Sequence, residues 1–264
     1  MNYEKLNKFS EFYFYDGGDM LTVLVINSKG GSGKTTLSTN IASFYAGKEL
    51  KTAILDYDPQ SSSLQWLSVR PANLPRIHGA NAAPLKGTSL RSFNAWVPDD
   101  TEVLVIDAPA GAGGLLLKEL VRKSNFIVIP VAPSPIDIRA TANFIKDLLL
   151  VGGARTSNVK IAVVANRVRS HSTTAYVALE RFLYALKFPF LTSISDSENY
   201  LLAAQNGEGV FDMDETATSS ERQEFMPIMK WMAGQFPNRF GVRADDKVAT
   251  LAGSRKFAAF RGGN

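Results

Sequence analysis

Residues 21–36 read Leu-Thr-Val-Leu-Val-Ile-Asn-Ser-Lys-Gly-Gly-Ser-Gly-Lys-Thr-Thr, and this stretch decides the fold. Its first six residues form an apolar run of the kind found in strands that are buried on both faces of a sheet. Glycines follow at positions 30, 31 and 33, and a helical pattern covers about 34–46. The stretch therefore predicts a strand, a glycine-rich loop and a helix in immediate succession.

The loop has the composition of a phosphate-binding site. Glycine is needed because the backbone wraps a phosphate so closely that side chains would clash, and the loop N–H groups and the helix N-terminus bind anionic oxygens. In this pattern Lys34 reaches the β- and γ-phosphates and the Thr35 hydroxyl binds Mg²⁺. ATP and Mg²⁺ are the expected ligands. The expected phosphate-contacting residues are Gly30, Gly31, Ser32, Gly33, Lys34, Thr35 and Thr36.

A second lysine, Lys29, stands at the first position of the loop, five residues before Lys34. Two ammonium groups in one loop repel each other unless negative charge compensates them. Lys29 can fold onto its own nucleotide, or it can cross a two-fold interface to the phosphates of a partner chain. The pattern by itself leaves both arrangements open.

Strand-like and helical stretches alternate along the chain, which predicts a doubly wound α/β fold with a mostly parallel sheet covered by helices on both faces. Ligands of such sheets bind at the carboxyl ends of the strands. Residues 68–100 contain four prolines and predict short elements and loops. The expected strands are 21–26, 52–55, 103–106, 126–131, 160–165 and 190–192. The expected helices are 34–46, 114–123, 136–150, 172–186, 196–206 and 216–236. Pro227 lies inside the last span, and a proline is disfavoured in the interior of a helix, so the alternative is that this helix begins near Pro227.

Composition narrows the class of protein. The chain has 264 residues, of which 45% are hydrophobic and 20% charged, and these values are ordinary for a soluble globular protein. It has no cysteine, so disulfides, thiolate zinc sites and cysteine-ligated iron–sulfur clusters are excluded. No apolar run is long enough to span a bilayer and no signal peptide is evident, so we expect a cytoplasmic location.

The net charge of +4 comes from the end of the chain, because residues 239–264 carry six basic and two acidic side chains. A basic tail is typical of a protein with a polyanionic partner such as DNA, or it is a solvated tail without a partner.

We expect the chain to have three parts: a disordered N-terminal extension at 1–19, an ATPase domain at 20–238 and a basic tail at 239–264.

The N-terminal extension carries aromatic residues without a period that a helix or sheet would use. We expect it to be dispensable, with an internal translation start at Met20. The alternative is that Phe12–Tyr15 forms an aromatic docking peptide for a partner.

The stretch Lys29-Gly-Gly-Ser-Gly-Lys-Thr-Thr36 resembles the deviant Walker A box of the ParA/MinD family of ATPases. The resemblance covers about residues 20–235 and is strongest to small, ParF-like partition ATPases. It continues in four later segments, which are Ile54-Leu-Asp-Tyr-Asp-Pro-Gln60, Val103-Leu-Val-Ile-Asp-Ala-Pro109, Ile129-Pro-Val-Ala-Pro-Ser-Pro-Ile-Asp137 and Ile194-Ser-Asp-Ser-Glu-Asn-Tyr200.

The resemblance implies a role for each matched residue. Lys29 contacts nucleotide across an ATP-bound dimer, and Asp58 orients the attacking water. Asp107 holds Mg²⁺ through its water shell. Asp56 is either an outer partner of Mg²⁺ or a cap of the turn before Pro59. Asn166 either recognises adenine or caps a loop.

The resemblance also implies a function. We expect a homodimer with ATP that binds DNA without sequence preference and positions cargo on the nucleoid, with slow hydrolysis stimulated by a ParB-like or cargo-adaptor protein. The alternative is a MinD-like membrane-cycling or regulatory ATPase, although the C-terminal segment is too weakly amphipathic to predict stable membrane binding. Candidate DNA contacts, each of which can equally be a solvated charge, are Arg155, Arg167, Arg169, Arg181, Lys187 and the tail.

Overall fold

The structure is a computed structural model that describes residues 12–14, 20–83, 96–171, 173–235 and 240–242. It divides into two compact units, one of Asp19–Ile228 and one of Met1–Gly18 with Met229–Asn264. The larger unit contains the glycine-rich loop and every residue predicted to contact the nucleotide.

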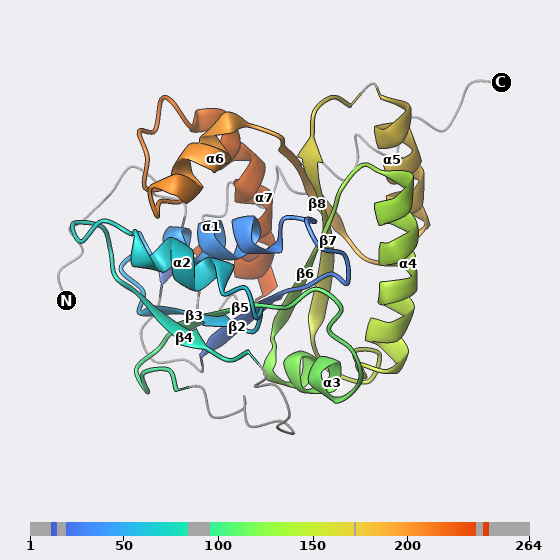
Figure 1. Ribbon diagram of the computed structural model, residues 1–264, viewed down its shortest axis with the longest axis horizontal. Helices are drawn as coiled ribbons and strands as arrows, with labels where there is room; N and C mark the ends of the chain where they lie inside the picture. The colour runs from blue at the N-terminus through green and yellow to red at the C-terminus, as the bar shows by residue number, and fades with distance from the viewer. Residues whose placement is uncertain (1–11, 15–19, 84–95, 172, 236–239, 243–264) are drawn as a thin grey trace. The chain divides into compact units, whose positions relative to one another are not determined.

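The larger unit is built on a seven-stranded sheet in the order β4-β3-β5-β2-β6-β7-β8, and all neighbouring strands are parallel (Figure 1). Every residue of β2, β3 and β5 is buried, as their apolar runs predict. The strands are β2 (Leu21–Val25), β3 (Thr52–Asp56), β4 (Ile77–Asn81), β5 (Val103–Asp107), β6 (Phe126–Val131), β7 (Lys160–Val168) and β8 (Phe190–Ser195).

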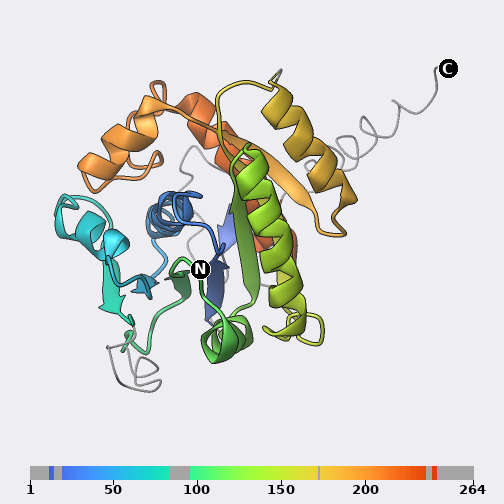
Figure 2. The ribbon, with the colours of Figure 1, turned by 45° about the vertical axis from the view of Figure 1, so that its right-hand side comes forward.

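Helices cover both faces of this sheet. Figures 1 and 2 show α1 and α2 on one face and α3, α4 and α5 on the other, with α6 beside α1 and α2. The predicted doubly wound α/β fold is therefore confirmed. The helices are α1 (Lys34–Ala46), α2 (Ser62–Ser68), α3 (Gly114–Lys123), α4 (Pro135–Leu150), α5 (Thr174–Ala185), α6 (Glu198–Gln205) and α7 (Ser219–Gln235).

The register of the central strands brings their carboxyl ends together. Asp107 at the end of β5 pairs with Val25 at the end of β2 and with Asp56 at the end of β3. The glycine-rich loop leaves the sheet directly after β2, so it lies beside both aspartates. The sheet thus gathers a phosphate-binding loop and two carboxylates at one edge.

The sequence did not predict α2 and β4 individually, and one helix differs from expectation. β4 is an edge strand in which only Ile77 is buried and half-buried and exposed residues follow. α2 has only seven residues, too few for a clear helical period. α7 begins at Ser219 and runs through Pro227, so the proline does not start it. Its first turn is held by tertiary contacts, because the Arg222 guanidinium donates to the carbonyls of Val210 and Met213.

A strand also forms in the N-terminal extension, where the sequence predicted none. β1 (Phe12–Phe14) pairs antiparallel with β9 (Phe240–Val242) in a two-stranded sheet. More than 200 positions separate the two strands, so no local period could reveal the pairing. The rest of the extension and the tail beyond residue 242 lie outside the described residues.

Candidate functional site

The glycine-rich loop adopts a conformation that its glycines permit. Gly31 has φ +76° and Gly33 has φ +91°, in the left-handed region that other residues rarely occupy. A side chain at Gly33 would also collide with a neighbour, because its Cβ would lie 1.8 Å from Nδ2 of Asn166. Both constraints explain why glycine stands at position 33. A Cβ at Gly30 or Gly31 would meet no atom within 4 Å, so the loop is open at these two positions.

Asn166 at the end of β7 braces this loop. Its side chain is buried, and its Nδ2 donates to the carbonyl oxygen of Ser32 at 2.8 Å. Of the two roles that the sequence allowed, the structure thus shows the contact to the loop. Recognition of adenine by Asn166 stays a prediction.

Asn27 anchors the start of the loop, and sequence reasoning missed it. Its Nδ2 donates to the Pro130 carbonyl at 2.7 Å and to the Thr141 hydroxyl at 2.9 Å, while its Oδ1 accepts from the Lys29 N–H at 3.3 Å. Asn27 is buried, so β2 is fixed to β6 and α4 immediately before the loop begins. The signal available in the sequence was a polar residue at the end of an apolar strand.

Lys34 points back over the loop, where its Nζ donates to the Lys29 carbonyl at 3.1 Å. Its side chain is buried, and burial lowers its pKa because the charged form is poorly solvated, while the carboxylates of Asp107 and Asp58 act in the opposite direction. The negative charge of nucleotide phosphates beside Lys34 would stabilise its ammonium group further.

Asp107 is buried with only 1% of its surface exposed, and neither of its carboxylate oxygens has a hydrogen-bond partner. Its pKa is raised to about 7, chiefly by burial and then by the negative charge of Asp56, while Thr35 and Lys34 act in the opposite direction. Buried oxygens without a partner are costly in a folded protein. The pair of Asp107 and Thr35 therefore fits a hydrated Mg²⁺ ion, whose preferred ligands are oxygens.

Protein side chains could not enclose such an ion on their own. Among the described residues, no group of three or more His, Cys, Asp or Glu side chains is placed to hold a metal. A magnesium ion at Asp107 would therefore take its remaining ligands from water and from the nucleotide phosphates, as is usual for Mg²⁺.

Asp56 caps the start of α2. Its Oδ2 accepts from the Ser63 hydroxyl at 2.6 Å and from the N–H groups of Ser63 and Leu64, while its Oδ1 accepts from the Asp58 N–H at 2.9 Å. The capping role that the sequence left open is thus present. A role as an outer partner of Mg²⁺ stays a prediction.

One cavity of about 370 Å³ unites most of the predicted residues. This volume lies within the range of small-ligand sites. Asp58 lies on the wall, where its Oδ1 also accepts from the Gln60 N–H at 2.9 Å. Ser32, Asp56 and Asp107 are buried and are not among the residues that line the cavity. The predicted residues that line it are Gly30, Gly31, Gly33, Lys34, Thr35, Thr36, Asp58 and Asn166.

The opposite wall contains residues to which the sequence assigned no role in the site. Arg167 has φ +58°, unusual for a residue other than glycine, and forms ion pairs together with Arg169 around Asp196. The hydrogen bond with Arg169 is the largest influence that holds the pKa of Asp196 below its ordinary value. The wall residues are Arg167, Ser195, Asp196, Ser197, Tyr200 and Leu201.

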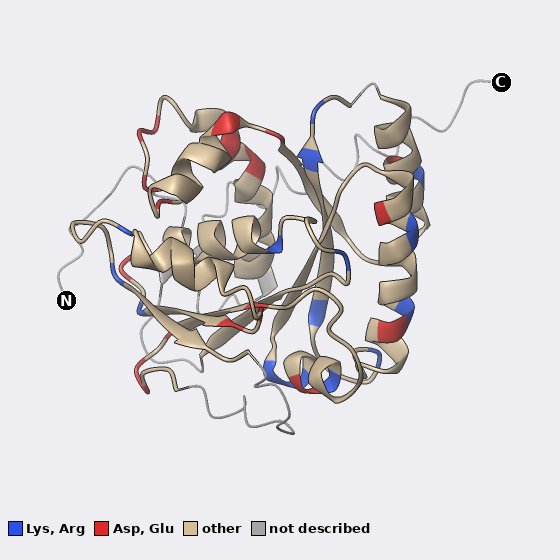
Figure 3. Cartoon of the chain, viewed as in Figure 1, with Lys and Arg blue, Asp and Glu red and all other residues tan. Residues whose placement is uncertain are grey.

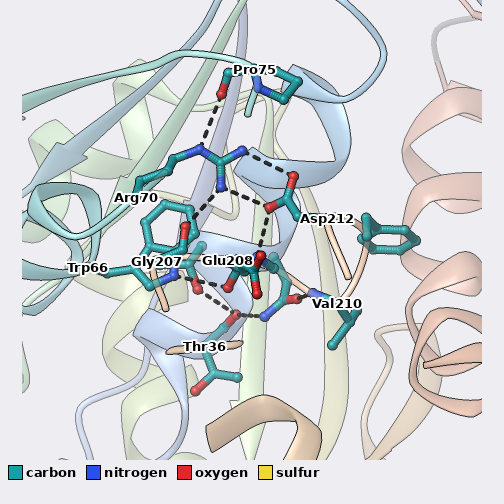
Figure 4. Close-up of polar contacts among 12 residues, drawn as sticks. Thr36, Trp66, Arg70, Pro75, Gly207, Glu208, Val210 and Asp212 are labelled. Carbon is teal, nitrogen blue, oxygen red and sulfur yellow. Dashed lines mark hydrogen bonds and ion pairs between the residues drawn. The ribbon is translucent and has the colours of Figure 1, made fainter. Parts of the chain in front are cut away.

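The side of α1 away from the loop is tied to the segment after α6 (Figure 4). Asn40 donates to the Thr36 carbonyl and accepts from the Val210 N–H, both at 2.8 Å. Close by, Arg70 and Asp212 form a two-pronged ion pair at 2.8 and 3.1 Å, and their side chains are 5% and 3% exposed. Arg70 follows α2, so this pair fixes the helix that Asp56 caps.

Comparison with known proteins gives one family and several relatives. Residues 23–210 match the family described as "CobQ/CobB/MinD/ParA nucleotide binding domain". Maintenance of carboxysome distribution protein A of Halothiobacillus neapolitanus is 29% identical over 199 residues, which are 73% of this chain and 87% of the relative. Protein ParA of Rhizobium radiobacter is 23% identical over 219 residues, which are 74% of this chain and 95% of the relative.

Solved structures show the same fold. The MinC:MinD cell division protein complex of Aquifex aeolicus superposes with a TM-score of 0.62 at 17% identity, covering 81% of this chain and 96% of that chain.

Proposed function

The chain belongs to the CobQ/CobB/MinD/ParA nucleotide-binding family, and on this premise we propose that it is an ATP-dependent dimerising ATPase that binds DNA without sequence preference and positions cargo on the nucleoid. The observation that carries the proposal is the cavity lined by the glycine-rich loop, Lys34 and Thr35, together with the buried, unpartnered Asp107, on which Thr35 and Lys34 act directly. Relatives named for carboxysome distribution and as ParA support the positioning part.

The residues around the cavity divide the work of hydrolysis. Lys34 and the loop N–H groups bind the β- and γ-phosphates, and Thr35 with Asp107 holds the hydrated magnesium ion, which when bound neutralises charge that develops on the phosphates. Asp58, which is half-buried on the cavity wall, orients the attacking water. Hydrolysis is slow in this proposal and is stimulated by a ParB-like or cargo-adaptor protein.

Dimerisation depends on Lys29. The side chain is only half-buried, while its backbone carbonyl already accepts from Lys34. The Lys34 ammonium group is thus held against the backbone of Lys29. In this proposal the side chain of Lys29 contacts the phosphates of the ATP bound to the partner chain. This contact offsets the repulsion between the ammonium groups of Lys29 and Lys34, and ATP thereby holds two copies together.

DNA binding depends on exposed cations. Arg155, Arg181 and Lys187 are exposed. Arg167 and Arg169 belong to the same set, because their side chains remain 57% and 83% exposed beside Asp196. Figure 3 shows basic positions along β7, whereas acidic positions gather over α6 and α7. The basic residues beyond 242, which lie outside the described structure, belong to the same proposal.

The test is DNA binding by the purified chain with ATP and with ADP over a range of salt concentrations. Binding is expected only with ATP, without preference for sequence, and to weaken steeply with salt because phosphate contacts release counterions. Deletion of residues 239–264 should weaken it if the tail contributes. Tight binding with ADP, or none with ATP at low salt, would refute the positioning function.

Liposomes of anionic lipid are the matched control for the membrane-cycling alternative. Within the described residues no helix is both long and apolar enough to cross a bilayer. ATP-dependent sedimentation with liposomes in the absence of DNA binding would favour that alternative.

A further inference from the structure

The wall of the cavity opposite the glycine-rich loop is held from behind by two carboxylates of α7. Glu224 accepts from the Ser195 N–H, the Ser195 hydroxyl and the Tyr200 hydroxyl, each at 3.0 Å. Glu221 accepts from the Ser197 hydroxyl and from Nδ2 of Asn199 at 3.0 Å. We call residues 195–200 the base wall, because the proposed phosphate contacts lie in the glycine-rich loop and these residues belong to another part of the cavity lining.

All five donors in these bonds are neutral groups of the base wall. Glu221 is buried and Glu224 half-buried, so their charges need such donors in place of water. Hydrogen bonds to an ionised acceptor are stronger than those between neutral groups. Burial and the Glu224 carboxylate both raise the pKa of Tyr200, so its hydroxyl keeps its proton and remains a donor toward Glu224.

The direction of these bonds decides what the base wall can offer a ligand. Ser195, Ser197 and Tyr200 line the cavity, yet their hydroxyl protons are directed to α7. A purine ring beside these three residues therefore finds hydroxyl oxygens that can accept a hydrogen bond, because the hydroxyl protons are already donated to α7. Guanine presents its O6 as an acceptor that needs a donor, whereas adenine presents its N6 amino group, which is itself a donor.

We infer that Glu221 and Glu224 are positioning residues that make the cavity select adenine over guanine nucleotides, by withdrawing the donors of the base wall from the base. The inference rests on the proposed nucleotide-binding function and adds a source of base specificity outside the phosphate loop. Neither carboxylate touches the nucleotide, since both act through Ser195, Ser197, Asn199 and Tyr200.

The test compares the affinities of the full chain for ATP and GTP, each with Mg²⁺, by calorimetry. The wild type is expected to prefer ATP. Glu224→Ala frees the hydroxyls of Ser195 and Tyr200 and should reduce the ATP:GTP affinity ratio about tenfold, mainly by a gain in GTP affinity. Glu224→Gln keeps an acceptor oxygen and should retain most of the ratio.

Two further variants separate this effect from general loosening of the fold. Adding Ser195→Ala and Tyr200→Phe to Glu224→Ala removes the freed hydroxyl donors and should restore much of the preference for ATP. Gln223→Ala, at an exposed position of the same helix, should leave the ratio unchanged.

A folded Glu224→Ala variant with the wild-type ratio would overturn the inference. If that variant does not fold, Glu221→Ala decides by the same measurement. A wild type that binds ATP and GTP equally also overturns the inference but leaves nucleotide binding intact, whereas a wild type that binds neither refutes the proposed function itself.

Discussion

Replacing Asp107 with asparagine is expected to stabilise the nucleotide-free protein while abolishing its response to Mg²⁺ and ATP. The carboxylate is buried, and its pKa is raised from 3.8 to about 7. The folded protein therefore holds this proton more tightly than the unfolded chain does. The contribution of Asp107 to the free energy of unfolding is therefore favourable at low pH, falls as the pH rises from about 4 to about 7, and stays low above that.

The size of the effect follows from that difference in pKa, which corresponds to roughly 4 kcal/mol at pH 8. The amide of Asp107→Asn removes this penalty but adds a buried NH₂ group, and an unsatisfied donor costs about 1–3 kcal/mol. The net gain is about 1–3 kcal/mol, which raises the Tm by roughly 3–10 °C for a domain of this size.

Thermal unfolding without nucleotide or metal, at pH 8 and at pH 5, measures the effect. The variant should melt above the wild type at pH 8, and the gap should narrow at pH 5. Addition of Mg²⁺ and ATP should stabilise the wild type but not the variant, because only a bound ligand shifts the unfolding equilibrium. Asp99→Asn, at an exposed position, is the control and should change neither Tm.

A variant that melts below the wild type at pH 8 would refute the reasoning, because Asp107 would then be stabilised in its charged form. A gap that is unchanged at pH 5 would show that the substitution acts through packing rather than through ionisation.

Four further substitutions test the rest of the site and the ion pair beside it. Lys34→Ala should abolish ATP binding in calorimetry, since the loop N–H groups cannot neutralise the phosphates alone, and an unchanged affinity would contradict this. Lys29→Ala should weaken ATP-driven dimerisation in light scattering but spare nucleotide binding, whereas Asp58→Ala should trap the dimer; a wild type that stays monomeric with ATP rules out both effects. Arg70→Ala leaves the Asp212 carboxylate buried without its ion-pair partner and should lower the free energy of unfolding, measured by urea denaturation, by about 3–5 kcal/mol. An unchanged free energy of unfolding would show that the ion pair is dispensable.

Much of the site was predictable because its chemistry lies in short, continuous motifs. The phosphate loop needs glycines, a lysine and a threonine within seven positions, and the aspartates that end β3 and β5 stand at the ends of apolar runs. These patterns depend on residues within one strand or one turn. They were sufficient to place the central strands, the order of layers and the edge of the sheet that carries the site.

The sequence by itself determined the identity of the phosphate-binding groups and the strands that present them, because both depend on neighbours along the chain. Only the tertiary structure decided which residues hold those groups in place. Asn166 reaches Ser32 across 134 positions, Asn27 reaches Thr141 across 114, and Glu224 reaches Tyr200 from another helix. The physical reason is that a single amide or carboxylate carries no period, so its partner is fixed only when the sheet brings distant segments within hydrogen-bonding distance.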